Sequence, residues 1–194
     1  DPLGQVDQAV ARYRSIVEGL DAQHAPSLDA LEAIYLNAER WQELYDVYQR
    51  KLDIASGDEE QAEIYARMAR LADQYLGRPD DAVGLLEKVL TLRGEDAETL
   101  ASLANLHDAA GRHNELIDVL ERQLAAESEH EPRVSIALRI PAVHLHHLRD
   151  AERAIEGYRR VLDIEPNSFD ALRALADIYR AQQAWEALVE TDQT

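Results

Sequence analysis

Apolar residues along this chain recur at helical spacing and come one or two at a time between charged positions. The segment that contains Leu28, Leu31, Ile34 and Tyr35 is typical. Residues three or four positions apart lie on the same face of a helix, because one turn takes about 3.6 residues. Each segment of this kind predicts an amphipathic helix, and the whole pattern predicts an all-α protein.

The pattern predicts eleven helices joined by short polar segments. Several boundaries carry residues that are typical of helix ends. Pro79 suits a first helical position, and Asp150 and Ser168 can cap the helices that follow them. Gly94 and Gly111 suit helix C-termini, because glycine readily adopts a positive φ. The predicted helices span residues 5–19, 26–37, 40–55, 58–76, 79–92, 96–110, 113–127, 131–148, 151–164, 167–181 and 184–191.

The pattern also repeats with a period of 72 residues. The apolar segment at 28–35 returns at 100–107 and 172–179 with the same internal spacing, and a second type of segment at 82–92 returns at 154–164. Each 72-residue unit therefore contains two helix hairpins. The second helices of the hairpins begin near Ala9, Leu44, Ala82, Leu116, Ala154 and Leu188, at intervals of 34 to 38 residues, and the 72-residue offset also relates Trp41, His113 and Trp185.

These hairpins resemble tetratricopeptide repeats, whose period is about 34 residues. In that family a large residue, a large-small pair and an aromatic residue follow one another along the first helix. An alanine, an aromatic residue and a proline follow along the second helix. Glu32 and Pro141 depart from the pattern, because they stand where the family has its small residue. Residues that fit it are Leu172, Leu175, Ala176 and Tyr179 for a first helix, and Ala154, Tyr158 and Pro166 for a second.

The resemblance implies a right-handed superhelical α-solenoid of antiparallel helix hairpins that covers residues 1–194 as a single domain. Its first repeat has only a second helix and its last repeat is truncated, so we expect a piece of a longer bacterial array. Both ends of the stack would then be open, and self-association through these open ends is a hypothesis. The expected repeats are 1–25 (partial), 26–57, 58–95, 96–130 and 131–166 (full), and 167–194 (truncated).

The chain carries 38 acidic and 20 basic residues, for a formal net charge of −18. This charge repels phosphate backbones and anionic lipids, so we expect no nucleic-acid ligand. It suits a basic peptide as partner, although a charged surface also serves solubility alone. No apolar run approaches the roughly 18 to 20 residues that cross a bilayer, so we expect no membrane insertion. The absence of cysteine excludes disulfides and fits the cytoplasm and the periplasm equally.

The resemblance also implies that the first helices line a concave groove, in which a protein or peptide partner binds. The chaperone-binding branch of the family clamps a terminal carboxylate there with a lysine and asparagines. Only Asn105 matches that set, so we expect no such clamp. The residues expected to face the groove, called the predicted groove residues below, are Asp29, Ala33, Leu36, Arg70, Asp73, Asn105, Asp108, Leu145, Arg173, Asp177 and Arg180.

His144, His146 and His147 form the most chemically suggestive cluster. His144 and His147 share a helix face, where two imidazoles can bind a metal. However, no carboxylate stands at helical spacing to complete a zinc site, so we predict no metal. His144 and His107 fill the aromatic position of the family, and we predict that both are packed in the core. Pro141 lies inside a predicted helix and should kink it.

The acidic clusters at 58–60, 95–98 and 127–131 each open a predicted helix. Carboxylates complement the positive end of the helix dipole there, so these clusters predict no calcium site. The chain has no glycine-rich phosphate loop and no nucleophile or metalloprotease motif, and we predict neither an enzyme nor a cofactor. The predicted function is a protein-interaction scaffold. An architectural spacer within a larger multidomain bacterial protein is the alternative.

Overall fold

The computed structural model describes residues 2–183, and within this range every regular element is a helix. This confirms the all-α prediction. The predicted helix at 184–191, with Trp185 and Leu188, lies outside the described residues. The elements are α1 (Pro2–Ser15), the π-helix η1 (Ile16–Leu20), α2 (Ala25–Asn37), α3 (Trp41–Leu52), α4 (Asp58–Gln74), α5 (Pro79–Arg93), α6 (Ala97–Ala109), α7 (His113–Ala126), α8 (His130–His146), α9 (Ala151–Ile164) and α10 (Phe169–Ala181).

Most of the helix-end predictions are confirmed. Pro79 is the first residue of α5, and the Asp150 carboxylate accepts a hydrogen bond of 3.0 Å from the backbone N–H three residues later. Gly94 and Gly111 have φ values of 85° and 66°, which explains glycine at both positions. The cap predicted at Ser168 is only half right, because Ser168 precedes α10 but its side chain makes no capping hydrogen bond.

The first helix differs from the prediction of one α-helix over 5–19. The helix α1 ends at Ser15, and the chain continues as the π-helix η1, whose hydrogen bonds span five residues instead of four. The guanidinium of Arg50, in α3, donates a hydrogen bond of 2.9 Å to the carbonyl of Val17 within η1. This contact is with a residue far along the sequence, so helical periodicity alone does not predict it.

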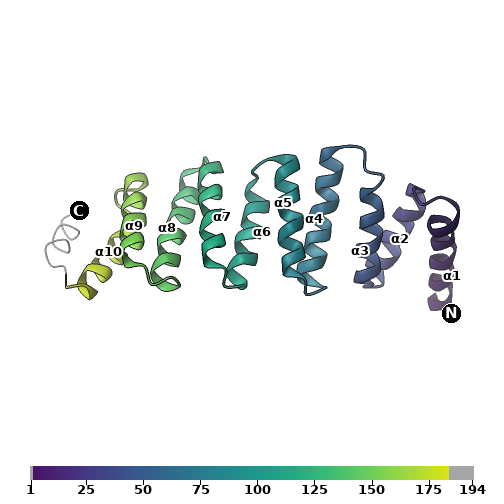
Figure 1. Ribbon diagram of the computed structural model, residues 1–194, viewed down its shortest axis with the longest axis horizontal. Coiled ribbons are helices and arrows are strands. Elements are labelled where there is room, and N and C mark those ends of the chain that lie inside the picture. The colour runs from purple at the N-terminus through teal and green to yellow at the C-terminus, as the bar shows by residue number, and fades with distance from the viewer. Residues whose placement is uncertain (1, 184–194) are drawn as a thin grey trace. The chain divides into compact units, whose positions relative to one another are not determined.

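The helices form two compact units, Asp1–Gly94 and Glu95–Thr194. In the first unit α2 packs on α3 and α4 on α5, and in the second α6 packs on α7 and α8 on α9, with α10 against α9. The two helices of each hairpin run antiparallel, side by side (Figure 1). Each unit is thus a stack of helix hairpins, which confirms the predicted α-solenoid fold.

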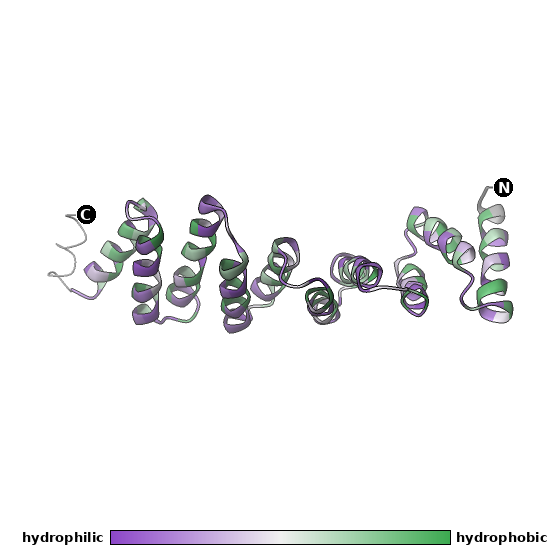
Figure 2. Ribbon diagram, turned by 90° about the horizontal axis from the view of Figure 1, so that it is seen from above, coloured by the Kyte–Doolittle hydropathy of each residue, from purple (hydrophilic) through white to green (hydrophobic). Residues whose placement is uncertain are grey.

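The 72-residue period corresponds to the core of each unit. The leucines at positions 28, 31 and 44 are fully buried, and so are those at positions 100, 103 and 116, which lie one period later. Apolar and polar residues alternate around the helices, so that each helix has one apolar face (Figure 2). The hairpins therefore stack through the same apolar positions in both units, as the repeated pattern predicts.

Stacked rings mark a second equivalence between the units. In the first unit the rings of Trp41 and Tyr75 stack with their centroids 4.1 Å apart. One period later, His113 and His147 stack with their centroids 4.2 Å apart. Each pair joins the start of one hairpin's second helix to the end of the next hairpin's first helix. The period therefore preserves a ring contact between hairpins even where the ring type changes.

The predicted roles of the buried histidines are confirmed. His107 and His144 are both in the core, and burial, followed by the nearby charge of Arg153, lowers the pKa of His144. His147 is exposed and lies against the ring of His113, so it does not join His144 in the core. The helix α8 continues through Pro141, whose ring is fully buried.

Candidate protein-interaction surface

The predicted groove residues lie on the first helices of the hairpins. Asp29, Ala33 and Leu36 belong to α2 and occupy positions i, i+4 and i+7, so they share one helix face. Arg173, Asp177 and Arg180 have the same spacing on α10. The other pairs and single residues are Arg70 and Asp73 on α4, Asn105 and Asp108 on α6, and Leu145 on α8.

These residues are accessible to a partner. Ten of them are exposed, and Leu145 is partly exposed. Leu36 is 51% exposed, which is high for a leucine and leaves an apolar side chain on the surface of the first unit. The residues that alternate with them on the same helices, such as Leu31 and Leu103, are buried in the core. These helices therefore bury one face and expose the predicted groove residues on another.

Several of the predicted charges have partners within the chain. The carboxylate of Asp29 accepts a hydrogen bond of 2.6 Å from Lys51, and Asp177 pairs with Arg180 at 2.7 Å. The Asp29 side chain is still 68% exposed, so this ion pair remains open to solvent. Within residues 2–183, no hydrogen bond or ion pair involves the side chains of Asp73 or Asp108. These two carboxylates are available to a basic partner.

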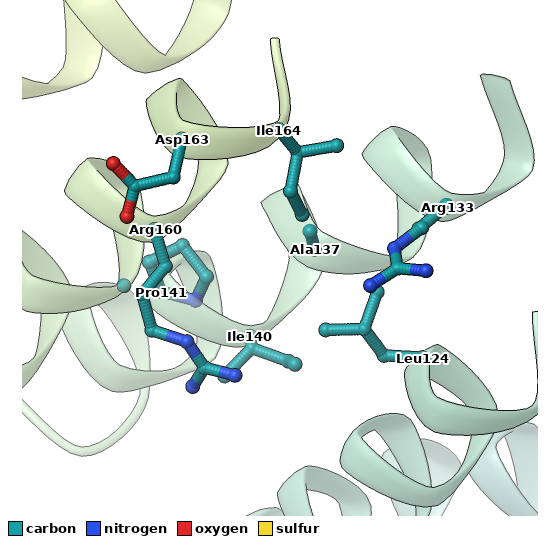
Figure 3. A pocket seen from close by; sticks show the side chains of 9 residues that line it. Leu124, Arg133, Ala137, Ile140, Pro141, Arg160, Asp163 and Ile164 are labelled. Atoms are coloured by element: carbon teal, nitrogen blue, oxygen red, sulfur yellow. The ribbon is translucent and has the colours of Figure 1, made fainter. Parts of the chain in front are cut away.

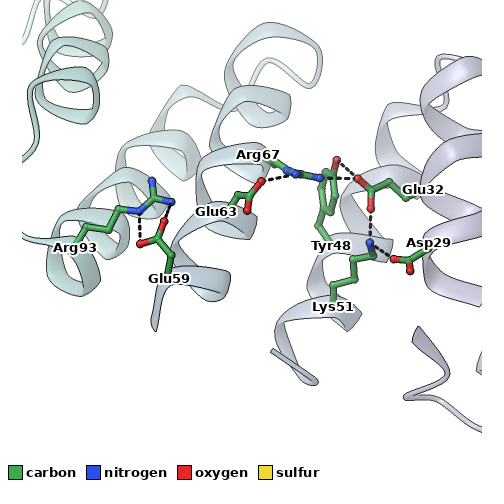
Figure 4. Close-up of polar contacts among 8 residues, drawn as sticks. All are labelled: Asp29, Glu32, Tyr48, Lys51, Glu59, Glu63, Arg67 and Arg93. Atoms are coloured by element: carbon green, nitrogen blue, oxygen red, sulfur yellow. Dashed lines mark hydrogen bonds and ion pairs between the residues drawn. The ribbon is translucent and has the colours of Figure 1, made fainter. Parts of the chain in front are cut away.

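Glu32 is the polar residue of this region whose role sequence reasoning missed. It stands at the family's small position, and the structure gives the reason for the departure. Its carboxylate accepts hydrogen bonds from Lys51 and Tyr48 of α3 and from Arg67 of α4, the last at 2.9 Å (Figure 4). The Glu32 side chain is only 15% exposed. It therefore ties α2 and α3 to the first helix of the next hairpin.

The electrostatics of this cluster reinforce the contacts. Burial opposes a charge on Lys51, but hydrogen bonds to Asp29 and Glu32 raise its pKa above the ordinary value, so it stays protonated. The hydrogen bond to Glu63 raises the pKa of Arg67. Burial, with the charge of Glu32, raises the pKa of Tyr48. Both cations are thus held by carboxylates, and the hydroxyl of Tyr48 remains a hydrogen-bond donor.

A hollow of about 250 Å³ opens beside this cluster. Its walls include Asp29, Tyr48 and Lys51, together with the apolar side chains of Ile54 and Ile64. The sequence carried one signal for the cluster, because Glu32 is an acidic residue at a position that the family keeps small. The pairing itself could not be predicted, since Arg67 lies 35 residues away on another hairpin.

The described residues were compared with the features of a metal site and of a membrane span. Among the described residues, histidines and carboxylates form no group of three or more that is suited to a metal. None of the described helices has the combination of length and apolar character that a bilayer span requires.

Comparison with known proteins agrees with this geometry. The tetratricopeptide repeat family model matches residues 27–62 and 99–133, two segments that begin one 72-residue period apart. Cellulose synthase operon protein C of Xanthomonas axonopodis pv. citri (strain 306) is 29% identical over 194 residues. That match covers 93% of this chain but only 12% of the relative, so the chain spans a small part of that protein's length.

Solved structures show the same fold at low sequence identity. MamA is 18% identical, with a TM-score of 0.53 over 83% of this chain and 90% of that one. YrrB, a TPR protein with an unusual peptide-binding site, is also 18% identical, with a TM-score of 0.52 over 89% of this chain and 84% of that one. The chain is therefore an α-solenoid with tetratricopeptide repeats at residues 27–62 and 99–133, which confirms the family that the sequence predicts.

Proposed function

We propose that this chain is a non-catalytic scaffold that binds an extended segment or helix of a partner protein along its first helices. The observation that carries the proposal is the exposure of the predicted groove residues on shared helix faces. Fixed helices present such residues at little entropic cost, because the surface is formed before the partner arrives. The fold also supports the proposal, since tetratricopeptide repeats are typically interaction modules.

The charge of the chain supports a basic partner. Asp73 and Asp108 have no partner among the described side chains, and the net charge of −18 attracts a cationic segment from a distance. The exposed Leu36 and the partly exposed Leu145 would then supply affinity, while the carboxylates supply orientation. We infer a partner segment that alternates basic and apolar residues.

Charge reversal on one unit tests this proposal. Asp108→Lys combined with Asp177→Lys changes two exposed positions on the first helices α6 and α10. The matched control is Asp118→Lys combined with Glu156→Lys, which makes the same change in charge at exposed positions of the second helices α7 and α9. Partners captured from the native host by the unchanged chain are identified by mass spectrometry and then titrated against each variant.

The first-helix variant should weaken binding about ten-fold and reduce its dependence on salt, because it removes two favourable charges from the interface. The control should change affinity much less. Equal loss in both variants would show that only the total charge matters. Unchanged binding in the first-helix variant would refute binding on this surface.

A role as an architectural spacer is the second candidate. The regular 72-residue period favours this role. So does the match to only 12% of the length of the Xanthomonas relative, because the rest of such a protein could carry the activity. We propose that either role serves a cellulose-synthesis system like the one after which that relative is named. Removal of residues 27–183 in the native host should then lower cellulose output. A spacer would regain function with any stack of the same length, whereas a binding scaffold would not.

A further inference from the structure

The second unit has a hollow of about 240 Å³ between α7, α8 and α9 (Figure 3). Its walls include the apolar side chains of Leu124, Ala137, Ile140 and Ile164, and the acidic residue Asp163 also lines it. The side chains of Arg133 and Arg160 approach it from α8 and α9, respectively. An apolar floor with cations at the mouth is suited to a side chain that is both apolar and attracted to positive charge.

Small residues form part of the wall of this hollow, whereas the first unit has a hollow of about 390 Å³ at the corresponding place, with Tyr65 and Leu85 in its wall. Position 137 holds alanine, whereas the corresponding positions of the other four first helices hold Leu28, Tyr65, Leu100 and Leu172. Three of these side chains are leucines, and the one exactly a period earlier is a tyrosine. The fourth hairpin therefore lacks the large side chain that its sister hairpins supply at this place.

The counterpart in the first unit shows what fits beside the cation. There the ammonium of Lys88 lies over the ring of Tyr65, 4.9 Å from its centroid. One period later these two positions hold Arg160 and Ala137. The cation has been kept and the ring has been lost. A guanidinium is at least as good a partner for an aromatic face as an ammonium.

Arg160 is held in place for such a contact. Its Nη1 and Nη2 atoms donate to the two carboxylate oxygens of Glu121 at 2.9 and 3.2 Å. These hydrogen bonds use the edge of the guanidinium, whereas an aromatic ring stacks on its face. Formation of the ion pair with Glu121 therefore leaves the stacking interaction available.

On the opposite wall, Pro141 leaves no room for a side chain at position 157. A specific close contact therefore shapes this side of the hollow. A Cβ atom at position 157 would lie 2.8 Å from the Cβ of Pro141, closer than such atoms approach. Leu85 stands one period earlier. Pro141 and Gly157 thus form a matched pair that excludes a larger side chain on α9 and shapes this wall of the hollow.

We propose that this hollow is a second recognition site, which receives the aromatic ring of a tyrosine side chain from a partner protein and stacks it against Arg160. The ring would take the place that Tyr65 has in the first unit. The site is separate from the predicted groove residues. That a protein carries the ring rests on the proposed scaffold function, whereas the preference of the hollow for a ring is tested without any partner.

The test is a titration of the 15N-labelled chain with N-acetyl-tyrosinamide, followed by NMR, with N-acetyl-leucinamide as the second probe. The tyrosine probe should shift the amide resonances of Ala137 and Gly157 in a saturable way, with the millimolar affinity expected of so small a ligand. The leucine probe should bind several-fold more weakly. Arg160→Gln should reduce the affinity for the tyrosine probe by about two- to five-fold, the value of an exposed cation-π contact.

Filling the hollow from within should abolish binding. Ala137→Tyr restores the ring of the first unit, and Ala137→Leu restores the side chain of three sister hairpins, so the second variant carries the test if the first does not fold. Ala109→Tyr adds a tyrosine at an exposed position of α6 and should leave binding unchanged. Shifts that persist in a folded filled variant, fail to saturate, or are equal for both probes would overturn the proposal. If the first-helix variant Asp108→Lys/Asp177→Lys binds partners as well as the unchanged chain, the scaffold proposal fails but the proposal of a ring-binding hollow does not.

Discussion

Replacing Glu32 with alanine tests how the hairpins of the first unit are held together. Alanine is the kind of small residue that the family has at this position, so the sequence pattern alone predicts that the change is harmless. The structure predicts the opposite. The carboxylate of Glu32 is the shared acceptor for Tyr48, Lys51 and Arg67 on two other helices, and alanine would remove all three contacts.

The contacts give the size of the effect. The pair of Glu32 with Lys51 dominates, because their side chains are only 15% and 17% exposed, and a hydrogen bond between charged groups in such a place contributes about 1.5–3 kcal/mol. Arg67 is 47% exposed, so its pair with Glu32 adds less than about 1 kcal/mol. Since Lys51 keeps Asp29 and Arg67 keeps Glu63, the losses do not add fully. We expect a total cost of about 2–3 kcal/mol in the free energy of unfolding.

Urea unfolding followed by tryptophan fluorescence measures this cost. In a Trp185→Phe background Trp41 is the sole tryptophan, and it reports on the first unit. The matched control is Glu63→Ala, which removes an exposed carboxylate from Arg67 in the same cluster and should cost less than about 1 kcal/mol. If Glu32→Ala costs no more than Glu63→Ala, the reasoning that Glu32 ties the hairpins together is refuted.

Three further predictions concern packing, pH and helix capping. Gly157→Ala should destabilise the second unit by about 1–3 kcal/mol in urea unfolding, because its Cβ meets the Cβ of Pro141, and a double variant with Pro141→Ala should recover little of the loss, because alanine keeps that Cβ. Burial lowers the pKa of His144 below its ordinary 6.5, so only the unfolded chain takes up this proton readily as the pH falls below that value. Stability should therefore decline there, and thermal unfolding of His144→Phe should show a weaker decline. Asp150→Ala should cost about 1 kcal/mol in thermal unfolding through the lost cap of α9, whereas Ser168→Ala should cost far less, because Ser168 makes no capping hydrogen bond. Equal costs for these two variants would contradict the capping assignment.

The fold could be predicted from the sequence because its determinants are local and repeated. Apolar spacing marks each helix, residues such as Pro79 and Asp150 mark helix ends, and the 72-residue period multiplies the signal. The exposure of the predicted groove residues also follows from position on a helix face. What could not be predicted depends on contacts between hairpins. The π-helix before α2 and the contacts of Glu32 involve residues of other helices, for which a local pattern carries no information.

The candidate sites differ from the core in how they behave across the period. The fully buried leucines at 28, 31 and 44 recur unchanged after 72 residues, because each of these hairpins packs on its neighbours in the same way. Glu32 instead becomes Ala104, Lys51 becomes Gln123, and Tyr65 becomes Ala137. These changes remove the charged cluster from the second unit, and they leave an alanine in the wall of its hollow where the first unit has a ring. Since the fold tolerates both versions, such positions are free to vary without loss of the stack. Any recognition that distinguishes one part of this solenoid from another must therefore lie at the positions where the period is broken.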